Sequence, residues 1–229
     1  MIEVKNLIKN FKSGPVVTRV LRGIDIFIPQ GQFVAIMGKS GAGKSTLMYQ
    51  MSLLDTPTEG TIALDGIPTE VFTEQERTDF RLRKLGYIFQ DYALLPDLSA
   101  VENVLVPLLM RGASKAEATT QAIKALDAVG LAHVHNHRPS QLSGGEQQRV
   151  SIARAVALDP DILFADEPTA NLDSVSGDSV MQVLKDLHRD GQTIVMVTHE
   201  PEYAIYAQRV IHLEDGVVVS DVMQQAKAA

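Results

Sequence analysis

The chain has 229 residues, which is enough for one large globular domain or two small ones. Its hydrophobic share of 45% and charged share of 21% are ordinary for a folded soluble protein. Cysteine is absent, which excludes disulfides and cysteine-bound zinc and suits the cytosol. The formal net charge of −7 argues against nucleic acid as the main ligand, because duplex binding requires clustered Lys and Arg. No apolar run reaches the roughly 18 residues that indicate a membrane span, so any membrane would be reached through a partner.

The first part of the chain has the patterns of β-strands. Ile24, Ile26 and Ile28 alternate with polar residues, which is typical of a strand with one buried face. Residues 33–37 are nearly all apolar, as expected of a strand that is buried on both faces. A helical stretch is predicted next, over residues 46–54.

The middle of the chain, residues 91–158, is predicted to be mostly helical. Two Ser-x-x-Glu patterns, at residues 99–102 and 114–117, are capping boxes of the kind that begin helices. Apolar residues recur at helical spacing over residues 101–109. The second helix is expected to end near Gly130.

Strands and helices alternate in the last part of the chain. Residues 162–165 and 193–197 have the composition of buried strands, and the segment between them carries a helical apolar face. Near the end, two apolar runs flank Glu214, Asp215 and Gly216, which predicts a hairpin.

These elements predict an α/β fold with a helical insertion, in one domain that comprises residues 1–222. The core would comprise about residues 1–90 and 159–222, and the helical subdomain about residues 91–158. No repeat, low-complexity block or clear linker divides the chain. Residues 223–229 are expected to form a flexible tail.

One segment fits the phosphate-binding pattern G-x-x-x-x-G-K-[ST], between a predicted strand and a predicted helix. Glycines let backbone N–H groups converge on phosphate oxygens, and the helix N-terminus adds partial positive charge. Lys44 would neutralise the β- and γ-phosphates of a nucleotide, and the Ser45 hydroxyl would bind Mg²⁺. The alternative is a glycine-rich turn without a ligand, but the flanking elements favour the phosphate site. The residues that match the pattern are Gly38, Lys39, Ser40, Gly41, Ala42, Gly43, Lys44 and Ser45.

Asp166 and Glu167 stand at the end of an apolar run. In proteins with such a phosphate-binding turn, an Asp placed there holds Mg²⁺, and the neighbouring carboxylate can orient or deprotonate the attacking water. Taken alone, a strand that ends in Asp-Glu is more often a solvated strand end. His199 follows another predicted strand and could contact the γ-phosphate, although a structural loop histidine is the alternative.

Ser143-x-x-Glu146 forms a third capping box, so a helix is expected to begin there. Gly144 and Gly145 lie in its first turn, where glycine costs stability relative to alanine. Exposed N–H groups beside such small residues would make a second anion site. The alternative is a well-capped helix without a ligand. Two phosphate-binding devices of different design in one chain favour a dimer.

The segment Leu-Ser-Gly-Gly-Glu-Gln-Gln-Arg, residues 142–149, closely resembles the signature segment of the ABC ATPases. The resemblance extends from residue 1 to about residue 219, with the family's other motifs in the family's order. It implies that Gln90 belongs to the Q-loop and that residues 162–167 form the Walker B strand. The implied fold is a P-loop NTPase of the ABC ATPase type. It would have an N-terminal antiparallel β region and an α-helical subdomain inserted in the core.

The resemblance also implies roles for single residues. Asp173 would belong to the D-loop, and Phe11 takes the place of the aromatic residue that stacks on adenine, usually Tyr in this family. The implied catalytic residues are Glu167, His199 and Lys44. The implied Mg²⁺ ligands are Ser45, Gln90 and Asp166. The implied ATP-binding residues are Phe11, Gly38, Lys39, Ser40, Gly41, Ala42, Gly43, Lys44, Ser45, Thr46, Gln90 and His199. The residues that would contact the ATP of the other subunit are Ser143, Gly144, Gly145 and Glu146.

The function that this resemblance implies is ATP hydrolysis, with ATP and Mg²⁺ bound between the subunits of a homodimer. The dimer would drive a separate integral membrane permease and lie in the cytoplasm, on the inner face of the cell membrane. No nucleic acid partner is expected. Within the family, the chain most resembles the group that serves lipoprotein release, macrolide export and cell division. Two alternatives stay open: a soluble ABC ATPase of DNA repair or translation, and a regulatory ATPase that controls cell-wall hydrolysis.

Two positions depart from the commonest family pattern. Glu146 stands where Gln is more frequent, and Ala170 stands where Gly often follows Pro-Thr. Neither departure removes a group that the implied chemistry requires.

His133, His135 and His137 recur at every second residue beyond the helix expected to end near Gly130, which raises a metal site as an alternative. Residues 136–139 also belong to the pattern of the ABC group named above, and this favours a role in the fold.

Overall fold

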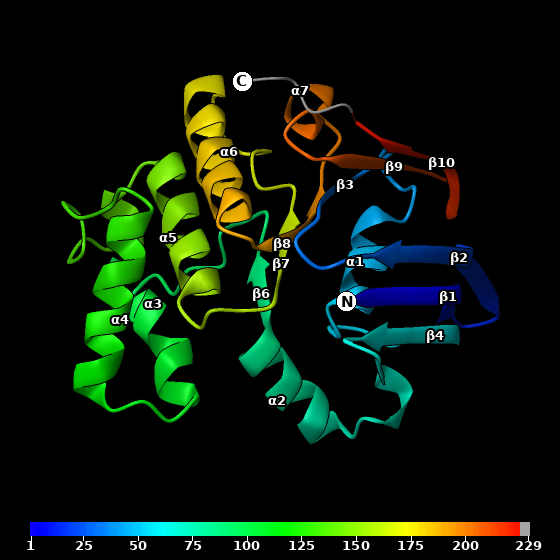
Figure 1. The fold of residues 1–229 in the computed structure, drawn as a ribbon, viewed down its shortest axis with the longest axis horizontal. Helices are drawn as coiled ribbons and strands as arrows, with labels where there is room; N and C mark the ends of the chain where they lie inside the picture. The colour runs from blue at the N-terminus through cyan, green and yellow to red at the C-terminus, as the bar shows by residue number, and fades with distance from the viewer. Residues whose placement is uncertain (225–229) are drawn as a thin grey trace. The chain divides into compact units, whose positions relative to one another are not determined.

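The computed structural model describes residues 1–224 (Figure 1). The chain divides into two compact units. Of the described residues, 1–79 and 191–224 form unit 1, and 80–190 form unit 2. The flexible tail expected over residues 223–229 falls outside the described residues from 225 onward.

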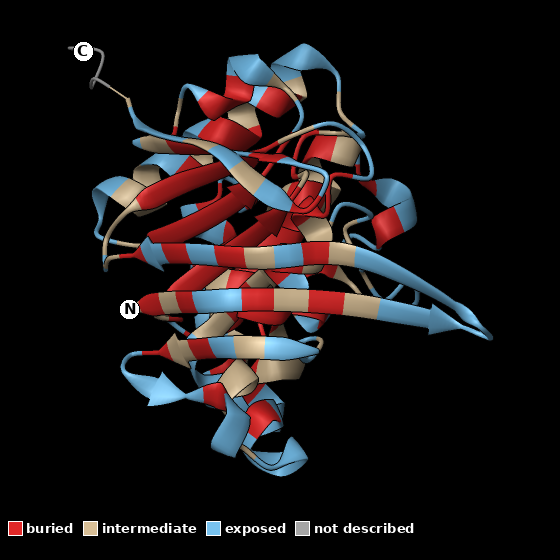
Figure 2. Ribbon diagram, turned by 90° about the vertical axis from the view of Figure 1, so that its right-hand side faces the viewer, coloured by how far each residue is buried: buried red, intermediate tan, exposed pale blue. Residues whose placement is uncertain are grey.

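Unit 1 contains an antiparallel sheet of four strands in the order β2-β1-β4-β5. Figure 1 shows β1, β2 and β4 side by side. Buried and exposed residues alternate along these strands (Figure 2), and Ile24, Ile26 and Ile28 are buried as expected. The strands are β1 Ile2–Ser13, β2 Val16–Ile28, β4 Glu59–Leu64 and β5 Ile67–Pro68.

A second group of strands in unit 1 has β3 (Phe33–Met37) between β8 (Thr193–Val197) and β9 (Arg209–Glu214), parallel to both. Every residue of β3 and β8 is buried, which confirms the prediction from their apolar composition. β10 (Val217–Met223) returns antiparallel to β9. The turn between them has Asp215 at φ 46° and Gly216 at φ 78°, as a type I′ hairpin requires.

Helix α1 (Lys44–Met51) begins and ends earlier than the predicted range 46–54. Gly43 is its N-cap, so the last residues of the phosphate-binding pattern already belong to the helix. It ends because Leu53 takes a left-handed conformation with φ 60°. The N–H groups of Leu54 and Leu53 then donate to the carbonyls of Tyr49 and Gln50, which is a Schellman motif.

Three short or strongly charged helices were not predicted: η1 (Thr69–Val71), α2 (Glu74–Lys84) and α7 (Pro201–Ala204). α2 is mostly exposed and carries almost no apolar stripe, so its sequence gives no periodic signal.

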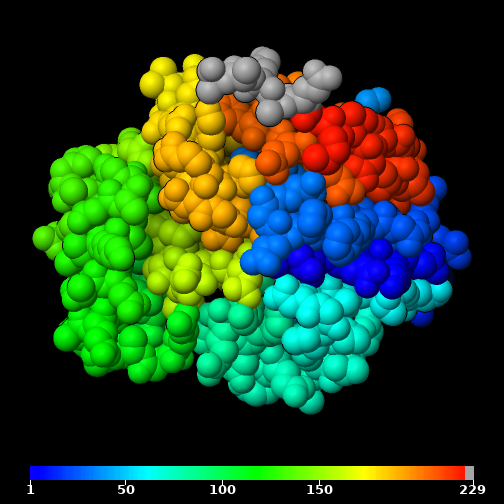
Figure 3. All heavy atoms as spheres, in the orientation of Figure 1, coloured from blue at the N-terminus to red at the C-terminus, as the bar shows by residue number. Residues whose placement is uncertain are grey.

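Unit 2 combines two parallel strands, β6 (Leu85–Ile88) and β7 (Ile162–Asp166), with the end of α2, four further helices and a short 3₁₀ turn. α5 packs against α3, α4, α6 and β6. In the space-filling view α3 and α4, in green, lie side by side as one continuous surface (Figure 3). The helices are α3 Ala100–Met110, α4 Lys115–Ala128, α5 Gly144–Val156 and α6 Ser174–Arg189, and the 3₁₀ turn is η2 Pro139–Gln141.

The three capping boxes expected from the sequence are confirmed. In α3, α4 and α5, the N-cap serine accepts from the N–H of the glutamate three residues on, and that glutamate accepts from the serine N–H. α4 ends at Ala128, and Gly130 follows with φ 77°, as predicted. Among residues 1–224, no helix has both the length and the apolar character needed to cross a membrane.

Close backbone approach makes a testable difference between two glycines of unit 1. A β-carbon at Gly60 would lie 2.2 Å from the carbonyl oxygen of Asn6, whereas Gly66 has nothing within 4 Å, and both have positive φ. Gly60→Ala is therefore expected to lower the free energy of unfolding by about 3 kcal/mol, from left-handed strain plus overpacking. The matched control Gly66→Ala should lose only the strain, about 1 kcal/mol. Urea denaturation measures both, and equal losses would contradict the steric explanation.

Candidate functional site

The phosphate-binding turn of unit 1 joins β3 to α1, and its backbone runs too close to β9 for a side chain. A β-carbon at Gly38 would lie 2.2 Å from the carbonyl oxygen of Leu213, and one at Gly43 would lie 3.0 Å from a methyl group of Leu21. Gly41, at φ 81°, has nothing within 4 Å of its β-carbon position. The turn is thus packed on one side and open above Gly41, where a ligand can approach the backbone.

The start of α1 favours an anion. Gly43 supplies no side-chain cap, and the first turn contains no acidic residue. The side chain of Lys44 folds back over the turn, and its ammonium donates to the carbonyls of Gly38 at 2.9 Å and Lys39 at 3.2 Å. Lys44 is only 6% exposed. An ammonium and the positive end of a helix dipole therefore act on the same small region.

The β9–β10 hairpin braces this turn. The Gly216 N–H donates to the Ala42 carbonyl at 3.1 Å, and the Gly216 carbonyl accepts from the Arg22 N–H at 2.9 Å. A β-carbon at Gly216 would lie 2.1 Å from the carbonyl oxygen of Val20, so only glycine fits there. Through these contacts, β2 and the β9–β10 hairpin hold the phosphate-binding turn in place.

The carboxylates Asp166 and Glu167 lie at the end of β7 in unit 2. Asp166 is 6% exposed, and the Tyr87 hydroxyl donates to it at 3.2 Å. Glu167 has a left-handed backbone with φ 44°, which costs a non-glycine residue about 1 kcal/mol. Such strain concentrates at functional sites. The strand thus ends in a buried carboxylate, followed by a residue in a strained conformation.

The first turn of α5 holds the signature residues. The N–H and the hydroxyl of Ser143 both donate to the Glu146 carboxylate at 2.8 Å, and the Glu146 N–H donates back to the Ser143 hydroxyl at 3.3 Å. The backbone N–H of Ser143, then its hydroxyl, hold the pKa of Glu146 below its ordinary value. A β-carbon at Gly144 would lie 3.0 Å from the Tyr92 hydroxyl, and one at Gly145 would lie 3.0 Å from the side chain of Ser176. A β-carbon at either position would require a neighbouring side chain to move by a few tenths of an ångström.

The segment after β6 and the segment after β7 contact each other within unit 2. The Asn171 side-chain amide donates to the Gln90 carbonyl at 3.1 Å, and the Tyr92 hydroxyl donates to the Asn171 carbonyl at 3.4 Å. Asp173 caps α6 by accepting from the Ser176 N–H at 2.9 Å. The residues expected to form the Q-loop and the D-loop thus meet in one network of hydrogen bonds.

Arg154 is a member of this network that no sequence motif singles out. Its guanidinium, on α5, donates to the carbonyls of Tyr92 at 2.9 Å and Ala93 at 2.6 Å. Tyr92 and Ala93 both have left-handed backbones, with φ 59° and 48°. Arg154 therefore holds a strained turn directly after Gln90. The contact joins residues about sixty positions apart in the chain, so no local pattern could have indicated it.

The expected site residues fall into both units. Unit 1 holds the exposed ring of Phe11, the turn over residues 38–46 and the exposed His199 after β8. Unit 2 holds Gln90 and the remaining site residues, which are Ser143, Gly144, Gly145, Glu146, Asp166, Glu167 and Asp173.

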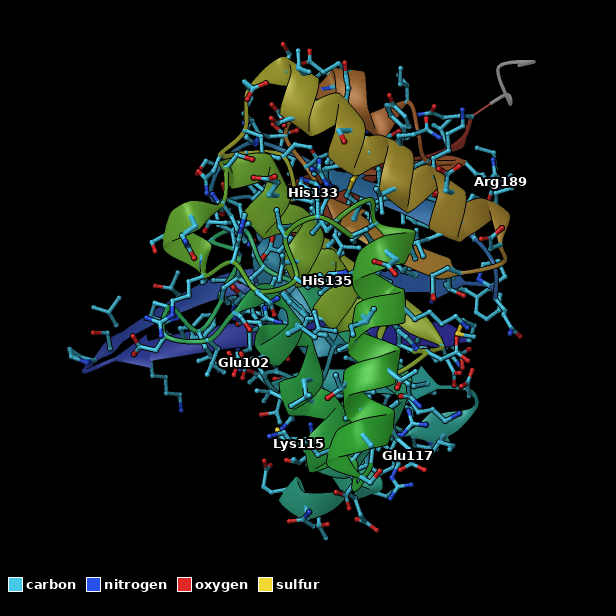
Figure 4. The ribbon with its side chains drawn as sticks, turned by 90° about the vertical axis from the view of Figure 1, so that its left-hand side faces the viewer. Glu102, Lys115, Glu117, His133, His135 and Arg189 are labelled. Carbon is cyan, nitrogen blue, oxygen red and sulfur yellow. The ribbon has the colours of Figure 1, made fainter. Side chains whose placement is uncertain are left out.

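The three histidines considered for a metal site do not converge. His133 lies 3.4 Å from a Glu146 oxygen, whereas His135 contacts Asp127 at 2.8 Å. Figure 4 shows His133 and His135 in the loop after α4, at the opposite end of that helix from Lys115 and Glu117. These contacts give the metal alternative no support.

A family model described as ABC transporter matches residues 21–170. The chain belongs to the ABC transporter family. Relatives include an uncharacterized ABC transporter ATP-binding protein of Methanocaldococcus jannaschii, MJ1508, which is 49% identical over 96% of this chain and 98% of its own length. The macrolide export ATP-binding/permease protein MacB of Chlorobaculum tepidum is 46% identical over 98% of this chain. The cassette spans 34% of that MacB protein, about a third of its length.

Solved structures agree with the fold. The cassette matches a dimeric structure of a post-hydrolysis state of the ATP-binding cassette MJ0796 bound to ADP and Pi, with a TM-score of 0.92 and 43% identity. The match covers 99% of this chain and 100% of that one. A second dimeric structure of MJ0796, described as a bacterial ABC transporter cassette, matches with the same TM-score and 42% identity. The ABC ATPase fold and family expected from the sequence are confirmed.

The Arg154 contacts can be tested by hydrogen exchange. Arg154→Met removes two hydrogen bonds from a charged donor, so the amides of residues 91–94 are expected to exchange roughly tenfold faster or more. Arg189→Met, at an exposed position of α6, is the matched control and should leave these amides unchanged. Unchanged exchange in Arg154→Met would show that the turn holds its conformation without the guanidinium.

Proposed function

We propose that this chain binds and hydrolyses ATP, and that two copies hold two ATP molecules between them. The observation that carries the proposal is the phosphate-binding turn, where an open glycine backbone, an uncapped helix start and the buried Lys44 ammonium lie together. A polyphosphate is the ligand whose charge and acceptors match this set. The related cassette structure bound to ADP and Pi supports a nucleotide as that ligand.

In unit 1, Lys44 would neutralise phosphate charge. Two of its partners are the carbonyl oxygens of Gly38 and Lys39, which are weaker acceptors for an ammonium than phosphate oxygens. Residues 38–46 would contribute backbone N–H groups. The ring of Phe11 is 46% exposed, and this leaves aromatic surface for stacking on adenine.

Mg²⁺ fits the donors expected from the sequence: Ser45, Gln90 and Asp166. Each offers an oxygen, the donor that Mg²⁺ prefers, and Mg²⁺ at nucleotide sites takes few protein ligands because phosphates and waters complete its shell. Among residues 1–224, no group of three or more His, Cys, Asp or Glu could hold a metal. When bound, Mg²⁺ would neutralise charge on the β- and γ-phosphates.

Glu167 would orient and deprotonate the attacking water. Its left-handed backbone, at the end of the rigid strand β7, restricts the directions that its carboxylate can take. His199 would contact the γ-phosphate from its exposed position after β8. Asp173 would act in the D-loop from the N-cap of α6.

The second copy would complete each site. Residues 38–46 of one copy would face Ser143, Gly144, Gly145 and Glu146 of the other, where the first turn of α5 presents N–H groups to phosphate. A twofold pair contains two identical sites of this kind. The related cassettes are described as dimeric, which supports this arrangement.

The partner that we propose is an integral membrane permease, with the chain on the cytoplasmic face of the membrane. The MacB relatives support this, because their names combine an ATP-binding part with a permease, and the chain matches 34% of the first of them. The same names favour transport over DNA repair, translation or control of cell-wall hydrolysis. The permease would select the cargo.

Lys44→Ala should lower ATP hydrolysis by about 100-fold or more, comparable to the loss of one donor to a developing negative charge. Phosphate release measures turnover, and Lys185→Ala, at an exposed position of α6, is the control. Unchanged turnover in Lys44→Ala would refute the role given to its ammonium.

Glu167→Gln should bind ATP but trap a dimer. Gln keeps the size of the side chain and loses the base, so hydrolysis stops while the ligand contacts remain. Size-exclusion chromatography with light scattering measures the mass at saturating Mg-ATP. A variant that stays monomeric under these conditions, although it binds ATP, would count against the dimer.

A further inference from the structure

A buried lysine lies beneath the exposed aromatic ring of unit 1. Lys9, on β1, is 8% exposed, and its ammonium lies over the Phe11 ring at 5.0 Å from the ring centroid. This is within the roughly 6 Å at which a cation is attracted to an aromatic face. A register shift of β1 falls between Lys9 and Asn10, at the point where the strand turns its aromatic residue outward. No motif of the sequence names Lys9.

The same ammonium binds the segment after α1. It donates to the Asp55 carboxylate at 2.7 Å and to the Thr56 carbonyl at 2.7 Å. Asp55 also accepts from the side-chain amide of Gln50 at 2.9 Å, and Gln50 is a fully buried residue of α1. A continuous set of contacts therefore leads from the Phe11 ring to the helix whose first residue is Lys44.

The charges in this network are paired. Partial burial would raise the pKa of Asp55, but hydrogen bonds from Lys9, Thr56 and Gln50 outweigh it and hold that pKa below its ordinary value. A lysine as buried as Lys9 is uncommon unless it is paired. Backbone hydrogen bonds join the same two segments, since the Thr58 N–H donates to the Ile8 carbonyl at 2.9 Å. Attachment of β1 to α1 thus does not depend on Lys9 alone.

We propose that Lys9 is a positioning residue for the nucleotide base: it fixes the Phe11 ring and ties it, through Asp55 and Gln50, to the helix that carries the phosphate-binding turn. The inference rests on the function proposed above. α1 has eight residues, so it is about 12 Å long and rigid over that length. A fixed ring and a rigid helix set the distance between the Phe11 ring, on which the base would stack, and the Lys44 ammonium. The ammonium lies over the ring, and Phe11 is still 46% exposed, which leaves ring surface for the base.

The test compares ATP with inorganic tripolyphosphate, which has the phosphates and no base. Lys9→Met keeps the length of the side chain and removes its charge. We expect the Kd of ATP to rise about tenfold, the size of a lost stacking contact, while the Kd of tripolyphosphate changes by less than about twofold. The KM for ATP should rise with the same factor and kcat should stay unchanged. Lys12→Met, at an exposed position of the same strand, is the matched control.

A double-mutant cycle separates positioning from a merely structural role. If Lys9 acts through the ring, Lys9→Met should have little further effect on ATP affinity in a Phe11→Ala background. Equal weakening of both ligands, an unchanged ATP affinity, or the same loss with and without Phe11 would each overturn the inference.

A second variant and the wild-type chain separate failure of the inference from failure to fold and from failure of the proposed function. If Lys9→Met does not fold, Asp55→Asn releases the ammonium from its carboxylate, and it is expected to weaken ATP and spare tripolyphosphate in the same way. Were Asp55→Asn to weaken neither ligand, the inference would be wrong. A wild-type chain that binds neither ligand would instead refute the proposed function itself.

Discussion

Backbone packing that leaves no room for a β-carbon is the constraint on which the phosphate-binding turn depends. Gly38 lies against the Leu213 carbonyl, and Gly216 lies against Val20 and donates to Ala42. The turn is therefore shaped by a hairpin that the chain forms some 170 residues later, and not only by its own glycines. A turn that is ordered before a ligand arrives loses less conformational entropy on binding, so more of its contact energy appears as affinity.

Unit 2 differs, because strained backbone lies at or beside its motif residues and side chains from other elements support part of it. Tyr92, Ala93 and Glu167 all have left-handed backbones, at about 1 kcal/mol each. Arg154 donates to the carbonyls of Tyr92 and Ala93, and Asn171 donates to the nearby Gln90 carbonyl, so hydrogen bonds offset the strain in the segment after β6. Strain of this kind persists only where the surrounding structure fixes the conformation. The segment after Gln90 thus depends for its conformation on contacts from α5 and from the segment before Asp173.

The parts of the fold that the sequence predicted are those whose causes are local. A capping box needs two residues three apart, and the Asp215-Gly216 turn needs two residues in succession, so both were found. The ends of α1 were wrong because Gly43 and Leu53 set them through backbone conformation, which apolar spacing does not reveal. The site residues could be named from their motifs, but Lys9 and Arg154 could not. Their partners lie 46 and about sixty positions away, and only the folded chain brings them near.

The contacts of Ser143, in the signature segment, restrict how its hydroxyl can bind a nucleotide. The Ser143 hydroxyl has one hydrogen, and it is directed at the Glu146 carboxylate. The lone pairs of the hydroxyl oxygen can only accept a hydrogen bond. A phosphate oxygen also only accepts, so the lone pairs cannot bind it. In the proposed dimer the hydroxyl must therefore rotate away from Glu146 before it can bind the ATP of the other copy. Rotation about the Cβ–Oγ bond moves only the hydrogen and leaves the oxygen in place. The Glu146 N–H can therefore still donate to the Ser143 oxygen, and the Ser143 N–H still donates to the carboxylate, so both backbone bonds of the capping box survive. The carboxylate of Glu146 thus competes with nucleotide for the hydroxyl hydrogen of Ser143. This competition is stronger than that of the neutral Gln commoner in the family, because a charged acceptor forms the stronger hydrogen bond.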